Sequence, residues 1–85
     1  MPETIRSPRQ ELLIKRIVEA RKRAGLTQGE IAAHFGKHQP FIANIEAGQR
    51  RLDLVELIAL AEVLDLDLHQ LIDELKRAPT RFKKK

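Results

Sequence analysis

Cysteine, tryptophan and tyrosine are all absent from the 85 residues of this chain. Without cysteine, the protein has neither a disulfide framework nor a thiolate metal site. No apolar run approaches the roughly 20 residues of a membrane-spanning helix. The first residues also lack the apolar stretch of a secretory signal. We therefore expect a soluble, cytoplasmic protein with one small domain, stabilised by packing between helices.

Side chains suited to catalysis are also scarce. Serine occurs once, at Ser7, and no glycine-rich phosphate loop is present. His34 and His38 are four residues apart, but Gly36 breaks the helical spacing between them and no third metal ligand is near. We therefore predict no enzyme activity, no metal, no cofactor and no small-molecule ligand.

The charged residues are unevenly distributed along the chain, although the formal net charge is +4. Residues 1–52 contain ten basic and five acidic side chains, residues 53–75 contain seven acidic and no basic ones, and the last ten residues contain six basic ones. A polyanion should therefore approach the first half and the basic end. The acidic segment is expected to be a solvated surface, with contact to another protein such as polymerase as the alternative.

Four places in the sequence have the pattern of a helix start, in which a polar side chain accepts a hydrogen bond from the backbone three residues later. They are Ser7-Pro8-Arg9-Gln10, Thr27-Gln28-Gly29-Glu30, Asp53-Leu54-Val55-Glu56 and Asp67-Leu68-His69-Gln70. Glycines that can close a last helical turn follow at Gly25, Gly36 and Gly48. We predict an all-α fold, a five-helix bundle with helices over 8–24, 28–35, 39–47, 54–64 and 68–77.

Apolar residues recur at helical spacing within each predicted helix. Those expected to face the core are Leu13, Ile17, Ala20 and Ala24, then Ile31, Ala32 and Phe35, then Ile42 and Ile45, then Leu54, Leu57, Ile58, Ala61 and Leu64, and finally Leu68, Leu71, Ile72 and Leu75. The segment of the last two predicted helices contains more apolar residues than a single core-facing stripe requires, and the additional ones are Val55, Leu60, Val63 and Leu66. This surplus indicates either additional core or a homodimer interface. We favour an interface made by Leu66, Leu68, Ile72 and Leu75.

Residues 28–47 have the spacing of a helix-turn-helix. The small Ala32 stands where two helices must cross closely, and Gly36 supplies the positive φ that the turn requires. Ile42 and Ile45 anchor the second helix to the core, so its opposite side is free to enter the major groove of DNA.

The free side of this second helix is polar and carries no acidic residue. Its members are His38, Gln39, Pro40, Ala43, Asn44 and Ala47. Glutamine and asparagine can each form paired hydrogen bonds with adenine, and alanine or proline can contact the thymine methyl. For Phe41 two roles remain open: covering sugar and thymine methyls, or packing against the loop that follows the helix.

At these positions the sequence resembles the lambda-repressor-like (Cro-type, xenobiotic-response-element) helix-turn-helix family. The residues that carry the resemblance are 21–28, Ile31-Ala32, Phe35-Gly36, and Ile45-Glu46-Ala47-Gly48 with Arg50. It extends through the apolar positions of the later helices and covers roughly residues 13–75. The resemblance implies a lambda-repressor-like bundle whose partner is double-stranded DNA.

The resemblance also implies roles for individual residues. Gln28 would hold a phosphate and brace Gln39, which would contact a base, with Pro40 and Asn44 as further base-reading residues. Arg21 and Glu46 match a family pair that forms a buried salt bridge. The predicted phosphate contacts are Thr27, Gln28, Lys37, His38, Arg50 and Arg51.

Three positions depart from the family pattern. His38 replaces the usual serine or threonine cap, so the reading helix starts without a capping box. Lys37 replaces an apolar residue and is expected to point toward the DNA backbone. Asp65 replaces a glycine before the last helix, where aspartate tolerates the left-handed conformation.

These observations predict a transcriptional regulator of bacterial or phage origin, acting at the nucleoid. We expect a repressor that binds a pseudo-palindromic operator as a homodimer, with half-sites about 34 Å apart. The alternative is an antitoxin-type protein-interaction module that also binds DNA. The expected organisation is an N-terminal arm (1–7), a helix-turn-helix domain (8–77) and a disordered basic tail (78–85), which either adds phosphate affinity or only increases solubility.

Overall fold

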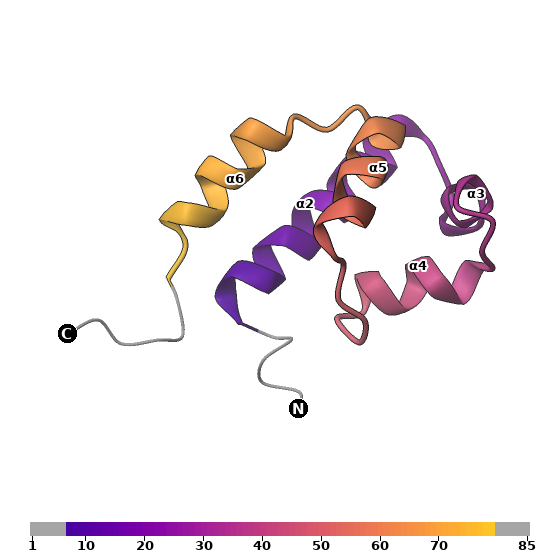
Figure 1. Ribbon diagram of the computed structural model, residues 1–85, viewed down its shortest axis with the longest axis horizontal. Coiled ribbons are helices and arrows are strands. Elements are labelled where there is room, and N and C mark those ends of the chain that lie inside the picture. Colours follow the sequence, from indigo (N-terminus) through magenta and orange to yellow (C-terminus); the bar gives the residue numbers. More distant parts are fainter. Residues whose placement is uncertain (1–6, 80–85) are drawn as a thin grey trace.

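The computed structural model describes residues 7–79, and this part of the chain consists of five helices and no strand (Figure 1). The helices are α2 (Pro8–Ala24), α3 (Gln28–His34), α4 (Gln39–Glu46), α5 (Leu54–Leu64) and α6 (Leu68–Arg77). The predicted all-α, five-helix fold is confirmed. Helices α3 and α4 each end one residue earlier than predicted, because Phe35 and Ala47 are C-caps.

Residues 1–6 and 80–85, which make up most of the expected arm and basic tail, lie outside the described residues. Among the helices that are described, none combines the length and apolar content needed to cross a membrane.

The helix starts follow the predicted caps closely. Thr27 and Asp53 form reciprocal capping boxes with Glu30 and Glu56, and the Ser7 hydroxyl accepts the backbone N–H of Gln10 at 3.1 Å. Each such cap contributes about 1 kcal/mol to stability. At the start of α6 only half of the expected arrangement forms. Asp67 accepts the backbone N–H of Gln70, but the Gln70 side chain turns to Glu74 instead.

Each of the four connections between the helices contains a residue with positive φ: Gly25, Gly36, Gly48 and Asp65. Gly36 has φ 65° between α3 and α4, in the turn of the helix-turn-helix. Asp65 has φ 54° after α5 and is the only non-glycine residue with positive φ in the described part of the chain. Aspartate adopts this conformation more readily than most residues because its short side chain hydrogen-bonds locally. The expectation that Asp65 tolerates the left-handed conformation before the last helix is confirmed.

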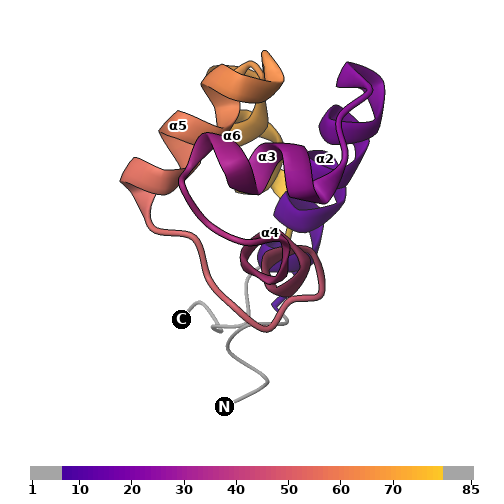
Figure 2. The ribbon, with the colours of Figure 1, turned by 90° about the vertical axis from the view of Figure 1, so that its right-hand side faces the viewer.

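Helices α3 and α4 pack against each other, and α2 packs against α4, α5 and α6. In Figure 1 α3 is seen nearly end-on while α4 runs across below it, and Figure 2 shows the same crossing from the side, with α3 above α4. Helix α6 runs antiparallel to α2 (Figure 1). The lower surface of the molecule in this view is therefore formed in large part by α4.

One hydrophobic core joins four of the helices. It contains Ile17 and Ala20 of α2, Ile31 and Ala32 of α3, Ile42 and Ile45 of α4, and Leu60 and Leu64 of α5. Ala32 has no exposed surface, which agrees with its predicted position at the crossing of α3 and α4. Phe35 packs against this core, as predicted, but is only partly buried.

The predicted inward face of α5 was partly wrong. Leu54 and Ile58 are 66% and 41% exposed, whereas Leu60, which was assigned to the surplus, is 1% exposed. The apolar residues surround most of α5, so their spacing did not select one side of the helix. Ala24 was also expected in the core and is exposed in the last turn of α2.

Helix α6 is tied to α2 by arginine side chains that the sequence analysis did not single out. Arg16 forms an ion pair with Glu74 at 2.7 Å. Arg9 donates to the backbone carbonyls of Lys76 and Ala78 at 3.1 and 3.2 Å. These carbonyls belong to the C-terminal end of α6, where helix carbonyls lack intrahelical partners.

Candidate nucleic-acid interface

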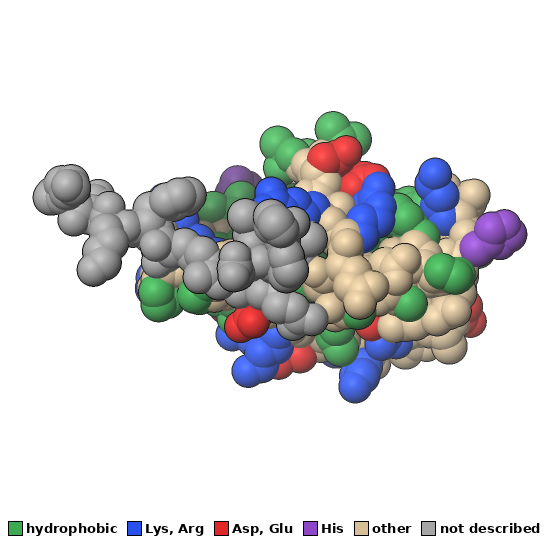
Figure 3. Space-filling view, turned by 90° about the horizontal axis from the view of Figure 1, so that it is seen from below, with side chains coloured by type: hydrophobic (Ala, Val, Ile, Leu, Met, Phe, Trp, Pro, Cys, Tyr) green, Lys and Arg blue, Asp and Glu red, His purple; other side chains and the backbone are tan. Residues whose placement is uncertain are grey.

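Helix α4 has one buried and one exposed side. Ile42 and Ile45 are each 1% exposed and hold the helix to the core. On the opposite side His38, Gln39, Pro40, Asn44 and Ala47 are exposed, and Ala43 is partly buried. Seen from below, the half of the molecule that carries α4 shows mainly uncharged groups, with Lys and Arg nearby and few Asp or Glu (Figure 3).

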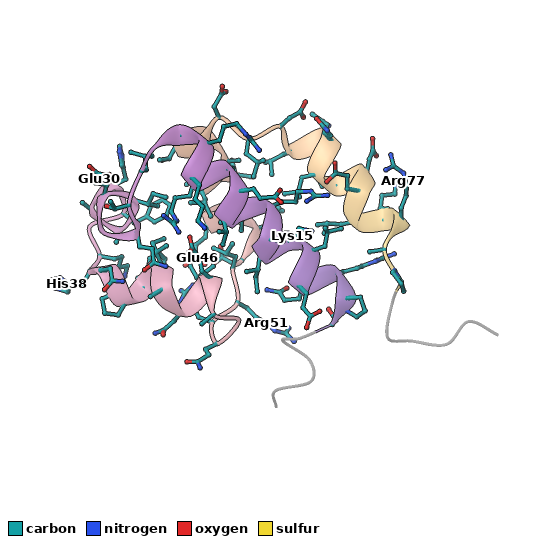
Figure 4. All side chains as sticks on the ribbon, turned by 180° about the vertical axis from the view of Figure 1, so that it is seen from behind. Lys15, Glu30, His38, Glu46, Arg51 and Arg77 are labelled. Carbon is teal, nitrogen blue, oxygen red and sulfur yellow. The ribbon has the colours of Figure 1, made fainter. Side chains whose placement is uncertain are left out.

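A largely buried ion pair connects the end of α4 to α2. Arg21 donates from Nε to Glu46 Oε2 at 2.7 Å and from Nη2 to Oε1 at 3.1 Å. A third donor, Arg21 Nη1, reaches the backbone carbonyl of Leu26 at 3.0 Å. The two charged side chains are only 14% and 8% exposed. Glu46 lies between α4 and α2 in Figure 4, so the pair fixes these helices to each other.

Two glutamines extend this ion pair to the start of α4. Gln28 donates from Nε2 to Glu46 Oε1 at 2.8 Å. Gln39 in turn donates from Nε2 to Gln28 Oε1 at 2.6 Å. The resemblance to the family related Gln28 to Gln39 and Arg21 to Glu46 as two separate pairs. The structure joins them into one chain of hydrogen bonds through the Gln28–Glu46 contact, which no sequence pattern indicated.

The N-terminal end of α4 is open. His38 occupies the N-cap position, but its side chain makes no capping hydrogen bond and points away from the helix end (Figure 4). The first turn contains no acidic residue, and Pro40 has no N–H to leave unpaired. The positive end of the helix dipole is therefore not neutralised by side chains on the exposed surface.

Phe41 packs within the protein rather than projecting from it. Its ring meets Phe35 edge to face, with centroids 5.7 Å apart. The Arg50 guanidinium lies 4.6 Å from the Phe41 centroid, and Lys37 Nζ lies 5.9 Å from it. Of the two roles left open for Phe41, the structure shows packing against the loop after α4.

Arg50, a predicted phosphate contact, pairs with a carboxylate of the same chain although its side chain is 40% exposed. It binds Glu56 through two parallel hydrogen bonds of 3.1 and 2.8 Å. This contact, with help from the Asp53 backbone N–H, lowers the pKa of Glu56 below its ordinary value of 4.5. The pKa of Arg50 is raised by the same partner. The pair links the loop after α4 to the first turn of α5.

The Arg50–Glu56 pair should make stability depend on pH. Because the pKa of Glu56 is depressed in the folded state, the contribution is complete above 4.5 and is lost as the pH falls through the lower folded-state pKa. We expect Glu56→Gln to be less stable than the parent at neutral pH, with the difference closing in acid. Urea denaturation of both proteins across this range measures it. A difference that does not change with pH would contradict the assignment.

The remaining predicted contacts lie on different parts of the surface. Thr27, Lys37 and Arg51 are exposed, and Thr27 also caps α3. Among the residues predicted for a dimer interface, Ile72 is 44% exposed, while Leu66, Leu68 and Leu75 are partly buried. His34 and His38 are exposed, and the described residues contain no group of three side chains that could hold a metal ion.

Comparison with known proteins identifies the family. A search of curated proteins found no match. A family model described as helix-turn-helix matches residues 17–71, which is more than half of the chain. The matched segment runs from the middle of α2 into α6 and includes all four residues of the hydrogen-bond chain. The protein therefore belongs to the lambda-repressor-like helix-turn-helix family, whose members are DNA-binding transcription regulators.

Proposed function

We propose that this protein is a sequence-specific repressor that places α4 in the major groove of a pseudo-palindromic operator and binds as a homodimer. The observation that carries the proposal is the position of Gln39. It is exposed at the start of α4, yet its amide is held by Gln28. A side chain held in place before binding loses less conformational entropy when it contacts a base.

The exposed side of α4 supplies the base contacts. Gln39 uses one N–H for Gln28 and keeps its carbonyl oxygen and a second N–H for DNA. Asn44, one to two turns further along the exposed side, carries the same two functional groups. Pro40 offers an apolar surface for a thymine methyl. We assign base reading to these three residues.

Phosphate contacts would surround this base-reading surface. Gln28 keeps one N–H that neither Glu46 nor Gln39 uses, and the Thr27 hydroxyl can donate while accepting from Glu30. Lys37, His38 and Arg51 are exposed and can donate to phosphate oxygens. We give Arg50 a smaller part, because a phosphate would have to compete with its two hydrogen bonds to Glu56.

The base-reading role of Gln39 can be tested by mutation. Gln39→Ala should weaken binding to operator by about 1–3 kcal/mol, the value of one paired contact to a base. Binding to random DNA should change little, because that binding depends on phosphate contacts. Sites selected from a random DNA pool by the parent protein provide the operator, and titrations at fixed salt provide the affinities. Equal operator affinity of parent and variant, with unchanged melting temperature, would remove Gln39 from this role.

A homodimer would place two reading helices on one face of the duplex, with half-sites about 34 Å apart. We assign its interface to Leu66, Leu68, Ile72 and Leu75. Ile72 offers the most direct test because it is 44% exposed, so an aspartate there leaves the core intact. Ile72→Asp should give a monomer by mass measurement during size-exclusion chromatography and should weaken operator binding.

The matched control for the dimer is Leu54→Asp. Leu54 is more exposed than Ile72, at 66%, but lies on α5 outside the assigned interface. We expect this variant to keep the mass of the parent. If Leu54→Asp separates the subunits and Ile72→Asp does not, the interface lies on α5 instead.

A further inference from the structure

We propose that Glu46 sets the base preference of Gln39 without touching DNA, by fixing the direction in which the Gln28 and Gln39 amides point. The inference rests on the proposed function, because it takes Gln39 as a base-reading residue. Glu46 ends α4 and faces α2 with 8% of its side chain exposed, whereas Gln39 begins α4 on the exposed side. Hydrogen bonds of Gln28 connect the two side chains.

The direction in which the Gln28 amide points is determined at Glu46. Carboxylate oxygens accept hydrogen bonds and cannot donate them, and both oxygens of Glu46 already accept N–H groups of Arg21. Gln28 can therefore bond to Glu46 only through its amide NH₂, as the 2.8 Å contact from Nε2 shows. With the Gln28 NH₂ turned to Glu46, the atom of Gln28 that contacts Gln39 is the carbonyl oxygen, Oε1.

The same reasoning applies at the next contact. Since Gln28 Oε1 can only accept, Gln39 must donate to it from Nε2, which it does at 2.6 Å. Gln39 then presents one acceptor, Oε1, and one remaining N–H donor outward. Adenine offers a donor and an acceptor side by side in the major groove, N6 and N7, which match this pair. Guanine offers two acceptors, O6 and N7, and matches only one of the two atoms.

The opposite direction would change the preference. If Gln28 directed its NH₂ at Gln39, Gln39 would turn its Oε1 toward Gln28 and its NH₂, with both N–H donors, outward. Two donors match the acceptors of guanine. The negative charge at position 46 therefore selects adenine over guanine through two intervening amides, and Arg21 contributes by holding the carboxylate in place.

Glu46→Gln tests this inference. The new amide at position 46 has one oxygen instead of two, so it can accept from Gln28 in one orientation and donate to it in the other. The direction of the hydrogen bonds that run from position 46 through Gln28 to Gln39, here called the relay, is then no longer fixed. At the base pair that Gln39 reads, we expect the preference for A·T over G·C, as a ratio of affinities, to fall by about fivefold or more, the lower end of what one paired contact supplies.

The matched control is Glu74→Gln, which makes the same chemical change in the Arg16–Glu74 ion pair between α2 and α6. It should lower stability without changing the affinity ratio. Gln28→Met interrupts the relay but leaves the Arg21–Glu46 pair in place. It should weaken binding to both sequences, because a phosphate contact is lost, and should also reduce the ratio. This variant decides the question if Glu46→Gln does not fold.

The outcomes separate the two proposals. If Gln39→Ala keeps the ratio of the parent, Gln39 does not read this base pair, and both its base-reading role and the inference about Glu46 are overturned. If Gln39→Ala loses the ratio while Glu46→Gln or, where that variant is unfolded, Gln28→Met retains it, the base-reading role stands and the relay from Glu46 is wrong.

Discussion

Glu46→Ala should lower the free energy of unfolding by about 3–5 kcal/mol, the usual cost of removing one member of a buried ion pair. The loss is large because Arg21 is only 14% exposed and would keep its charge without its carboxylate partner. The Gln28 amide would lose its acceptor as well. For a domain of this size, about 1 kcal/mol corresponds to roughly 4–8 °C. Thermal denaturation followed by circular dichroism should therefore show a melting temperature lower by more than about 10 °C.

Glu19→Ala is the control for this experiment. Glu19 also pairs with an arginine, Arg16, at 3.1 Å, but the two side chains are 44% and 33% exposed. Ion pairs in contact with solvent contribute about 0–1 kcal/mol. Similar melting temperatures for Glu19→Ala and Glu46→Ala would show that the Arg21–Glu46 pair is no more important to stability than a surface pair.

Leu60→Ala is expected to be similarly destabilising, by about 2–5 kcal/mol, because it leaves a cavity in the core. Leu60 is 1% exposed and belongs to the core cluster that also holds Ile31 and Ile45 of the helix-turn-helix. Urea denaturation should therefore give a lower midpoint with little change in slope. Since the same core supports α4, operator binding should fall at temperatures where the variant begins to unfold.

Leu54→Ala provides the comparison on the same helix. Leu54 is 66% exposed, and substitutions at such positions usually change stability by about 0.5 kcal/mol or less. The two leucines are six residues apart on α5 and differ in burial rather than in chemistry. A larger loss from Leu54→Ala than from Leu60→Ala would mean that α5 packs through its other side.

Much of the candidate interface could be predicted before the structure was known. The spacing of Ala32, Gly36, Ile42 and Ile45 predicted which side of α4 is exposed, because an α-helix turns by a constant amount per residue. The resemblance to the family added the relations of Gln28 to Gln39 and of Arg21 to Glu46. Neither source indicated that these form one chain, since the contact that joins them depends on how α3 crosses α4.

The role of Arg50 shows a second limit. Its position after Gly48, in a basic segment, favoured a phosphate contact. In the structure Arg50 also covers Phe41 and pairs with Glu56, and neither contact was predicted. The sequence predicted Glu56 as the third residue of a capping box, and the structure confirms that role. The capping box gave no sign of a second partner for the Glu56 carboxylate. The second partner of Glu56 is Arg50, in the loop before α5. The path of that loop depends on how α4 and α5 pack, which the local sequence does not show.

The sequence by itself determined where the helices begin and, to within one residue, where they end. A cap joins side chain and backbone three residues apart, and a left-handed residue such as Gly36 or Asp65 acts on its own turn, so both are local. Only the tertiary structure decided which side of α5 enters the core and which partners Arg16, Arg21 and Arg50 bind. Apolar residues surround most of α5, and an arginine reaches any nearby acceptor, so these choices depend on how separate helices pack.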